Sequence, residues 1–265
     1  MVFLFFITIV GACFGSFLCC QARRFHYNSN HKRKLKNPNS ICMKCGKKIK
    51  WYDNIPVLSW LLLRGKCRYC HHRIGATEIL SELSGAICFL LLSINFDPFT
   101  QNIYSILIYV ATLLLSLLFL FLAIYDGLYG ELPTFCLLLS IVCSVIIAIL
   151  KVFEKSPEAS FDHNFFINTF LSLSILGGLY LILYLVSKGR WVGDGDWLFA
   201  AAIGIALGHP ILALLALFIS NFSACLISLP LIKTNPKAKI FFGPFLLIAF
   251  IIVNSFSQFF FSFML

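Results

Sequence analysis

Long runs of apolar residues, separated by short polar segments, dominate the chain and predict membrane-spanning helices. The runs lie at about 2–20, 78–96, 103–125, 132–152, 164–187, 197–207, 211–232 and 240–263. Most of them have roughly the 20 residues that a helix needs to cross the hydrocarbon layer. The run at 197–207 is shorter, so it is either an incomplete span or half of one long buried hairpin. With this run counted, the pattern predicts about eight helices.

The basic residues predict how these helices are oriented. With the N-terminus outside, the cytoplasmic segments are 23–77, 126–131, 188–196 and 233–239, and they hold nineteen of the twenty-one Lys and Arg residues. Only Lys151 and Lys155 then lie outside. The positive-inside rule favours this arrangement, and it requires the short run to be counted. The first run has Arg23 and Arg24 after it and no basic residue before it, which favours a retained helix over a cleaved signal peptide.

Composition agrees with this pattern. Hydrophobic residues make up 60% of the 265 positions and charged residues only 12%, against about 25% charged in a soluble domain. The sequence therefore predicts an all-α polytopic protein in a lipid bilayer. The net charge of +10 comes mainly from segment 23–77, which carries fourteen Lys and Arg residues. Its run His31-Lys32-Arg33-Lys34 resembles a nucleic-acid patch, but the orientation rule accounts for it, so we expect no nucleic-acid partner.

Two C-x-x-C pairs in segment 23–77 predict a metal site. The four residues are Cys42, Cys45, Cys67 and Cys70. A reducing cytoplasm disfavours structural disulfides, and four thiolates suit a closed, tetrahedral, structural Zn²⁺. Thiol redox chemistry is the alternative for such pairs, and the neighbouring His71 and His72 are rival ligands. A loop of about fifty residues has too little core to fold alone, so bound zinc would supply the missing stability.

Two acidic positions adjoin apolar runs and predict a polar site at the membrane boundary. Asp126 follows the run at 103–125, and Asp196 ends the sequence Gly-Asp-Gly-Asp at 193–196. In the predicted topology both lie at the cytoplasmic edge, at the same depth. The alternatives are local: Asp196 as a helix N-cap, and Asp126-Gly127 as an ordinary helix end. Paired carboxylates in a helical bundle also occur in transporters, so proton-coupled transport and aspartyl proteolysis both remain open.

The whole chain resembles the type IV prepilin peptidases. The residues that carry the resemblance are, in chain order, Gly15-Ser16-Phe17-Leu18, Arg24, the segments 38–46, 51–60 and 65–70, Glu82, Gly85, Asp126 seven residues before Pro133, and the G-x-G-D motif at 193–196. The resemblance implies an aspartic protease of the cytoplasmic (inner) membrane in which Asp126 and Asp196 are catalytic. Asp194 occupies the variable position of the motif.

The resemblance also implies substrates and a methyl donor. Such enzymes cleave the leader from type IV prepilins or type II secretion pseudopilins after a glycine, and many methylate the new N-terminus with S-adenosylmethionine. Cys19 stands where the family often has Asn, so a peptidase without methyltransferase activity is the alternative. No Gly-rich nucleotide fingerprint locates the S-adenosylmethionine site.

These expectations define three parts of the chain and one local conformation. Residues 1–22 form the first transmembrane helix, 23–77 the cytoplasmic zinc-binding loop domain with its four cysteines, and 78–265 the transmembrane peptidase core. Gly193 and Gly195 leave room for a substrate backbone, and glycine also permits a positive φ in a tight turn before the helix.

Overall fold

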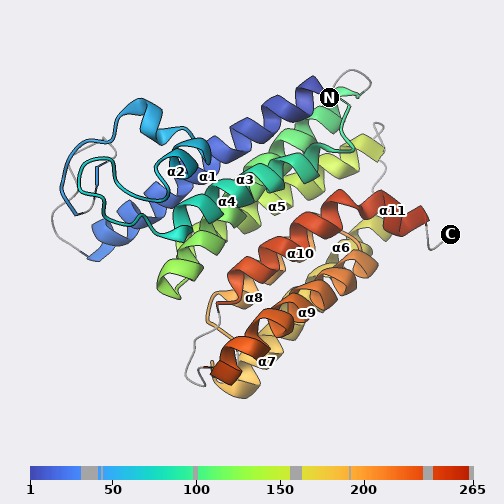
Figure 1. Ribbon diagram of the computed structural model, residues 1–265. Coiled ribbons are helices and arrows are strands. Elements are labelled where there is room, and N and C mark those ends of the chain that lie inside the picture. Colours follow the sequence, from blue (N-terminus) through green and yellow to red (C-terminus); the bar gives the residue numbers. More distant parts are fainter. Residues whose placement is uncertain are drawn as a thin grey trace. The chain divides into compact units, whose positions relative to one another are not determined.

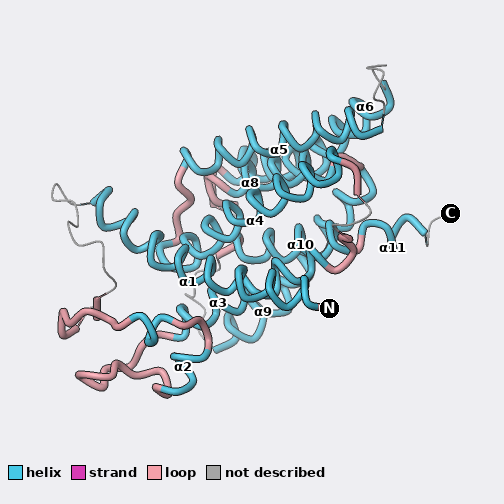
Figure 2. The backbone as a smooth tube through the Cα atoms, turned by 90° about the horizontal axis from the view of Figure 1, so that it is seen from above, coloured by secondary structure: helices cyan, strands magenta, loops and turns pink. Residues whose placement is uncertain are grey.

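The computed structural model is built from helices, and a region of loops and short helical turns occupies residues 44–75 (Figures 1 and 2). It describes residues 1–30, 41–42, 44–97, 101–155, 163–190, 192–234 and 241–262. Among these residues there is no strand, and the only β-type pairs are two isolated bridges, Ile41 with Lys48 and Lys66 with Arg73. The predicted all-α architecture is confirmed.

Several sequence expectations fall outside the described residues. They are the basic run 31–34, positions 38–40 and 43 of the family pattern, and Lys237 and Lys239 of the last predicted cytoplasmic segment.

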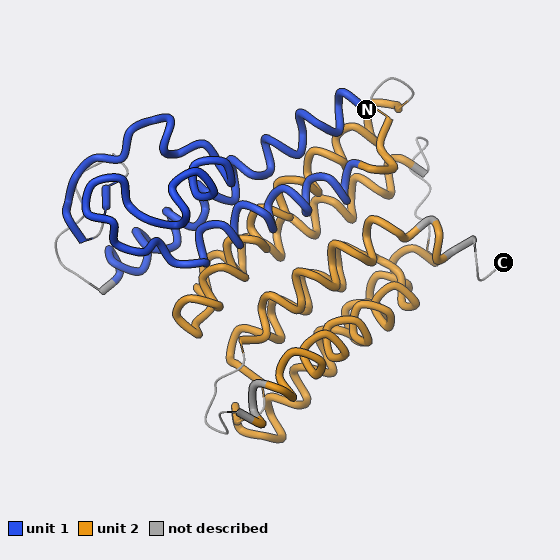
Figure 3. The backbone as a smooth tube through the Cα atoms, in the orientation of Figure 1, with its two compact units in different colours: residues 1–93 blue, residues 94–265 orange. Residues whose placement is uncertain are grey.

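The chain divides into two compact units, residues 1–93 and 94–265 (Figure 3). Unit 1 contains the long helices α1 (Val2–Asn30) and α3 (Ala76–Ser93). Between them lie the short helix α2 (Leu58–Leu62) and the 3₁₀ turn η1 (Trp51–Asn54).

Glycines bring the two long helices of unit 1 together. A Cβ added to Gly11 would meet the carbonyl oxygen of Gly85, and one added to Gly15 would meet that of Ser81. Membrane helices commonly approach each other through such small residues, because lipid tails give no hydrophobic drive for association.

Unit 2 contains the remaining helices. They are α4 (Ile103–Tyr129), α5 (Thr134–Lys155), α6 (His163–Leu173), the π-helical turn η2 (Ser174–Gly178), α7 (Leu179–Ser187), α8 (Asp196–Leu207), α9 (Pro210–Thr234), α10 (Gly243–Ser255) and α11 (Ser257–Ser262). Helix α6, η2 and α7 follow one another without a break and form one long element.

Six helical segments of the described chain are long and apolar enough to cross a membrane, and α8 and α10 are shorter apolar helices. The six segments and the two short helices lie where the eight apolar runs predict them. Helix α8, with 12 residues, is only about 18 Å long, well short of the roughly 30 Å hydrocarbon thickness. Most of its residues are nevertheless buried.

Three phenylalanines form the core of unit 2 around α8. The ring of Phe119 in α4 lies 4.9 Å, centroid to centroid, from the ring of Phe199 in α8 and 4.9 Å from that of Phe250 in α10. All three side chains are fully buried. This contact fixes the register of α4, α8 and α10 against one another.

Candidate active site and metal centre

Asp126 lies in the last turns of α4, on the face that carries Phe119. The two residues are seven positions apart, or about two helical turns. The Asp126 side chain is only 6% exposed, and the backbone N–H of Gly243 donates to its Oδ2 at 2.8 Å. Helix α4 continues to Tyr129 and ends at Gly130, whose N–H donates to the Asp126 carbonyl oxygen. Asp126 is therefore not at the helix end that the Asp126-Gly127 pair predicts.

Gly243 is required at the start of α10 because of this contact. A Cβ at this position would lie 2.9 Å from Oδ2 of Asp126. Gly243 is the first residue of α10, seven positions before Phe250, so the aromatic core holds its N–H near the carboxylate. The sequence did not predict a role for Gly243 at this site. Its only signal is Gly-Pro ahead of an apolar run, which marks a helix start and no more.

Asp196 is the first residue of α8, and its side chain is 7% exposed. The N-cap position belongs to Gly195, which makes no side-chain capping bond. The Asp196 carboxylate instead accepts from the N–H of Gly193 at 2.9 Å, on the chain before the helix. The N-cap interpretation of Asp196 is therefore wrong.

Neither motif glycine uses the positive φ that glycine permits. Gly195 has φ −96°, and Gly193 is not among the residues with positive φ. Their small size matters for a different reason, which is close packing. A Cβ on Gly195 would lie 2.6 Å from Cβ of Leu132, and one on Gly193 would lie 2.9 Å from Oδ2 of Asp196.

The two carboxylates are brought into one neighbourhood. Asp196 precedes Phe199 by one turn, and Asp126 follows Phe119 by two turns, so the contact between the two rings places both acids at the same end of the core. They lie close enough to interact electrostatically. Asp194, by contrast, is exposed and interacts with Tyr184.

Side chains from neighbouring helices hold the far end of α8. Ser172 Oγ in α6 donates to the Gly204 carbonyl oxygen at 2.6 Å, and Lys151 Nζ in α5 donates to that of Ala206 at 2.7 Å. The last carbonyls of a helix lack partners within it, and in a membrane this is costly. These two contacts allow a short buried helix to end inside the bundle.

In unit 1 the four predicted metal ligands come together. The Sγ atoms of Cys42, Cys45, Cys67 and Cys70 all lie within 4.8 Å of one another. Cys42 and Cys70, from different pairs, have their sulfurs 3.8 Å apart. Two ligands of a tetrahedral metal with bonds of about 2.3 Å would lie about 3.8 Å apart, so the cluster fits zinc. His71 and His72 are exposed, and neither belongs to the cluster.

The two C-x-x-C pairs form matching turns. The N–H of Gly46 donates to the carbonyl of Cys42, and the N–H of His71 donates to that of Cys67. Both Gly46 (φ +67°) and His71 (φ +53°) are left-handed and lie four residues after the first cysteine of their pair. His71 therefore occupies the position of a turn residue, and this explains its place beside the second pair.

One thiol of the cluster is prepared for deprotonation. The backbone N–H of Cys45 points at the Cys42 sulfur and, against the opposing effect of burial, holds the pKa of that thiol at about 6. Metal ligation needs the thiolate, so this contact favours ligation by Cys42. The Cys70 thiol is shifted the other way: against the backbone hydrogen bond from His72, burial and the neighbouring thiols raise its pKa to about 11.

Polar contacts tie the loop of unit 1 to its helices. Glu82, in α3, accepts from Ser16 Oγ in α1 and from the N–H of Val57, each at 2.7 Å. Val57 has φ +61°, a conformation that β-branched residues rarely adopt.

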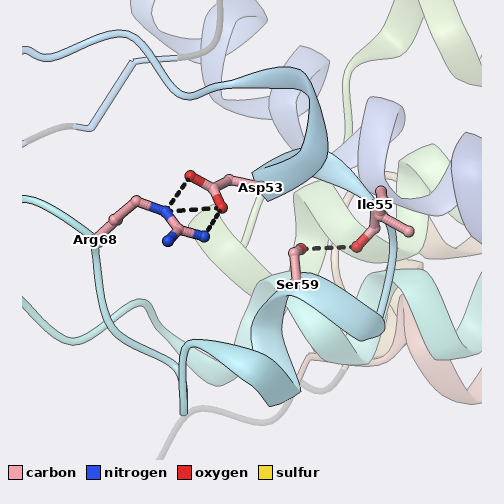
Figure 4. A network of polar contacts seen from close by, with 4 residues as sticks. All are labelled: Asp53, Ile55, Ser59 and Arg68. Atoms are coloured by element: carbon pink, nitrogen blue, oxygen red, sulfur yellow. Dashed lines mark hydrogen bonds and ion pairs between the residues drawn. The ribbon is translucent and has the colours of Figure 1, made fainter.

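Within the loop, Arg68 donates to both carboxylate oxygens of Asp53, and Ser59 Oγ donates to the carbonyl of Ile55 (Figure 4). The pKa of Arg68 is raised by the hydrogen bonds to Asp53.

The chain has relatives among known proteins. Residues 9–96 match the family described as "Bacterial Peptidase A24 N-terminal domain". The Prepilin leader peptidase/N-methyltransferase of Pseudomonas aeruginosa is 33% identical over 214 residues, covering 80% of this chain and 69% of that protein. The protein of that name from Legionella pneumophila is 28% identical over 87% of this chain and 77% of its own length. No solved structure matches the chain.

Other matches are shorter. The Vibrio cholerae protein of the same name is 39% identical over 31% of this chain, which is 34% of its own length. The match with the Myxococcus xanthus protein covers 25% of that protein's length. The relatives described here all carry the peptidase and methyltransferase name, and none is a transporter.

The family resemblance read from the sequence is thus confirmed over most of the chain. The six long apolar helices and these relatives make the protein a multi-pass protein of the inner membrane. This chain belongs to the prepilin leader peptidase/N-methyltransferase family.

Proposed function

We propose that this enzyme removes the leader from type IV prepilins or type II secretion pseudopilins and methylates the new N-terminal amine. The observation that carries the peptidase assignment is the pair of buried carboxylates, Asp126 and Asp196, aligned at one end of the aromatic core. The names of the relatives support both activities.

The two carboxylates act as an aspartyl pair that shares one proton, because two carboxylates in one site do not readily both ionise. The ionised member accepts a proton from water, whose oxygen attacks the scissile carbonyl carbon. The protonated member polarises the carbonyl oxygen, and a proton then passes to the leaving amine as the C–N bond breaks. The Gly243 and Gly193 N–H groups each hold one carboxylate in place.

The active site and the four-cysteine loop lie on the cytoplasmic side, with the N-terminus outside. The distribution of Lys and Arg over the polar segments supports this orientation. A basic cytoplasmic face does not attract a basic leader. The apolar helix of the pilin therefore supplies most of the affinity, and its membrane boundary presents the cleavage site to the aspartates.

Cys42, Cys45, Cys67 and Cys70 hold a structural Zn²⁺ that fixes the loop of unit 1. A closed shell of four thiolates leaves no open position on the metal, so zinc orders the loop and takes no part in catalysis. The methyl donor is S-adenosylmethionine. When bound it would supply a methyl group on its sulfonium sulfur, and the new N-terminal amine would accept that group and lose one proton.

The test is to incubate the purified enzyme with a purified prepilin, with and without S-adenosylmethionine, and to measure the N-terminal mass of the product. We expect leader loss in both reactions and one additional methyl group only when the donor is present. An unprocessed prepilin, from an enzyme preparation that is folded, would contradict the peptidase assignment. A processed product that never gains a methyl group would reduce the function to proteolysis alone.

A further inference from the structure

The loop of unit 1 carries an apolar surface that neither the peptidase chemistry nor the metal cluster uses. Leu58, Leu61 and Leu62 of helix α2 are each more than half exposed. Trp51 in η1, and Ile55 on the short stretch between η1 and α2, are exposed as well. We call these five residues the α2 patch. Large exposed apolar side chains that gather on one segment mark an interaction surface.

The two faces of α2 differ in what they contact. Leu58, Leu61 and Leu62 are spaced as i, i+3 and i+4, so they share one face of the helix. Trp60 lies on the opposite face and packs into the loop, since a Cβ on Gly65 would lie 2.8 Å from its ring and its Nε1 is buried. The loop therefore holds α2 by its tryptophan and leaves the three leucines facing outward.

Two contacts place the beginning of α2 below the surface of the bilayer. The ion pair of Arg23 with Glu78 joins α1 to the first turn of α3, and it marks the water boundary because basic residues flank membrane spans. Ser16 precedes Arg23 by seven residues, so it lies about 10 Å farther along α1, within the bilayer. Glu82 accepts from Ser16 Oγ and from the N–H of Val57, the residue before α2. Helix α2 therefore begins beside the membrane-spanning parts of α1 and α3.

The backbone at the start of α2 suits a place with little water. The first N–H groups of a helix usually lack partners in the chain, and unpaired groups are costly inside a membrane. Here three consecutive N–H groups, those of Val57, Leu58 and Ser59, all donate to groups of the protein. The Ser59 hydroxyl also donates to the Ile55 carbonyl (Figure 4).

The α2 patch is flanked by positive charge. Segment 44–73 has one acid, Asp53, which is paired with Arg68. Its basic residues are all exposed, and they are Lys44, Lys47, Lys48, Lys50, Arg64, Lys66, Arg68 and Arg73. An apolar helix face flanked by cations is typical of helices that lie in the membrane interface, about 5–10 Å deep, where anionic lipids attract the cations. The same charges repel a basic leader, which disfavours the substrate as the partner of this surface.

We propose that the α2 patch is inserted into the boundary layer of the bilayer and that the flanking basic side chains bind anionic phospholipid headgroups. The bilayer is the partner because Glu82 ties α2 to α3 at membrane depth, and because the charge of segment 44–73 is complementary to anionic lipid. The patch thereby holds the four-cysteine loop against the membrane.

The experiment maps which residues touch lipid. The full-length, zinc-loaded protein is placed in nanodiscs of phosphatidylcholine and phosphatidylglycerol in equal amounts, with a trace of phospholipid that carries a photoreactive diazirine high on its acyl chain. After ultraviolet irradiation, labelled peptides are identified by mass spectrometry. We expect label on residues 55–62 as well as on α1 and α3, and little label on the cysteine turns at 42–46 and 67–71.

Two results would overturn the inference. One is lipid label confined to the membrane-spanning helices. The other is a segment 55–62 that escapes lipid label but becomes protected from a water-soluble carbene reagent when a prepilin is added, because that result assigns the patch to the substrate.

A pair of variants tests the apolar contact. Leu61→Gln should lower the lipid labelling of residues 55–62 about threefold or more, because the favourable transfer of leucine out of water is lost. The matched control is Leu138→Gln in α5, at a leucine of nearly the same exposure, 54% against 56%. The control should leave the labelling of 55–62 unchanged, and an unchanged zinc content shows that the loop of each variant still folds. Equal labelling of 55–62 in the two variants would contradict the insertion of α2.

Headgroup binding has its own readout. In nanodiscs of phosphatidylcholine alone, labelling of 55–62 should fall about twofold or more, because the basic residues lose their anionic partners. Added salt should lower it in the anionic nanodiscs, since salt screens exposed charges. Equal labelling in both bilayers, independent of salt, would contradict the binding of anionic headgroups.

Discussion

Unit 1 and unit 2 position their functional groups in different ways. In unit 2 the alignment comes from apolar packing, because the contacts of Phe119 with Phe199 and Phe250 align the helices that carry the two aspartates. In unit 1 the loop is held by polar contacts such as those of Glu82, together with the four clustered thiols. One chain therefore holds two sites that lose their structure under different conditions. The aspartate site depends on helix register, and the loop depends on metal.

The largest expected effect is the loss of leader cleavage when an aspartate of the pair is replaced, with unit 1 unchanged. Asp126→Asn or Asp196→Asn removes a carboxylate that exchanges protons in the reaction, so we expect leader cleavage to fall at least about 10²- to 10⁴-fold. The zinc content of the same proteins should stay that of the wild type, because no unit 1 residue changes. Prepilin processing and zinc content are both measured on the purified variants. Normal processing in either variant would show that the replaced aspartate is not catalytic.

The second effect breaks unit 1 through its metal. We expect about one zinc per chain in purified protein, and its loss in the double variant Cys42→Ser/Cys67→Ser. The order of the loop should be lost with it, since a loop of this size has too little core to fold without the metal. Because metal ligation needs the four thiolates, the affinity for zinc should weaken steadily as the pH falls.

The control for the metal is Cys13→Ser/Cys225→Ser, which changes two exposed cysteines. Elemental analysis and a titration with a chelator measure the outcome. A metal-free preparation with normal folding would contradict the role assigned to zinc.

A smaller effect tests helix register in unit 2. Gly243→Ala places a Cβ about 2.9 Å from Oδ2 of Asp126, so the carboxylate and the start of α10 must move apart. We expect a ten- to hundredfold loss of cleavage, the range for a small misplacement of a catalytic group. Gly178→Ala is the matched control, because nothing lies within 4 Å of the added atom. Equal activities of the two variants would show that the Gly243 contact does not position Asp126.

The smallest effect concerns the far end of α8. Lys151→Met keeps the length of the side chain and removes the hydrogen bond to the Ala206 carbonyl. We expect the free energy of unfolding to fall by about 1 kcal/mol, with the zinc content of unit 1 unchanged. Denaturation in mixed micelles measures the difference against Lys233→Met, a change at an exposed lysine in the last turn of α9. Identical stabilities would mean that other groups donate hydrogen bonds to the last carbonyls of α8.

Much of this arrangement could be predicted from the sequence. The apolar runs located the long helices, and the short run at 197–207 predicted α8 almost to the residue, because a membrane helix is encoded by its own composition. The clustering of Cys42 and Cys45 with the second pair also followed from spacing alone. In both cases the signal is local.

The contacts that arise between helices could not be predicted. The N–H of Gly243 reaches Asp126 across more than a hundred residues, and nothing near either position in the chain encodes that contact. The role of Gly195 has the same origin. Glycine permits a positive φ there, but the residue is constrained by its packing against Leu132. The presence of glycine correctly indicated a constrained position, but the constraint comes from a residue that is distant in the sequence.

The central claim is that Asp126 and Asp196 work as one catalytic unit. The most direct test compares leader cleavage by Asp126→Asn, Asp196→Asn and the double variant, with a mass readout sensitive enough to follow very slow processing. Residues that act together are strongly non-additive, so each single variant should lose nearly as much activity as the double variant. Losses that multiply in the double variant, or normal cleavage by either single variant, would contradict the account.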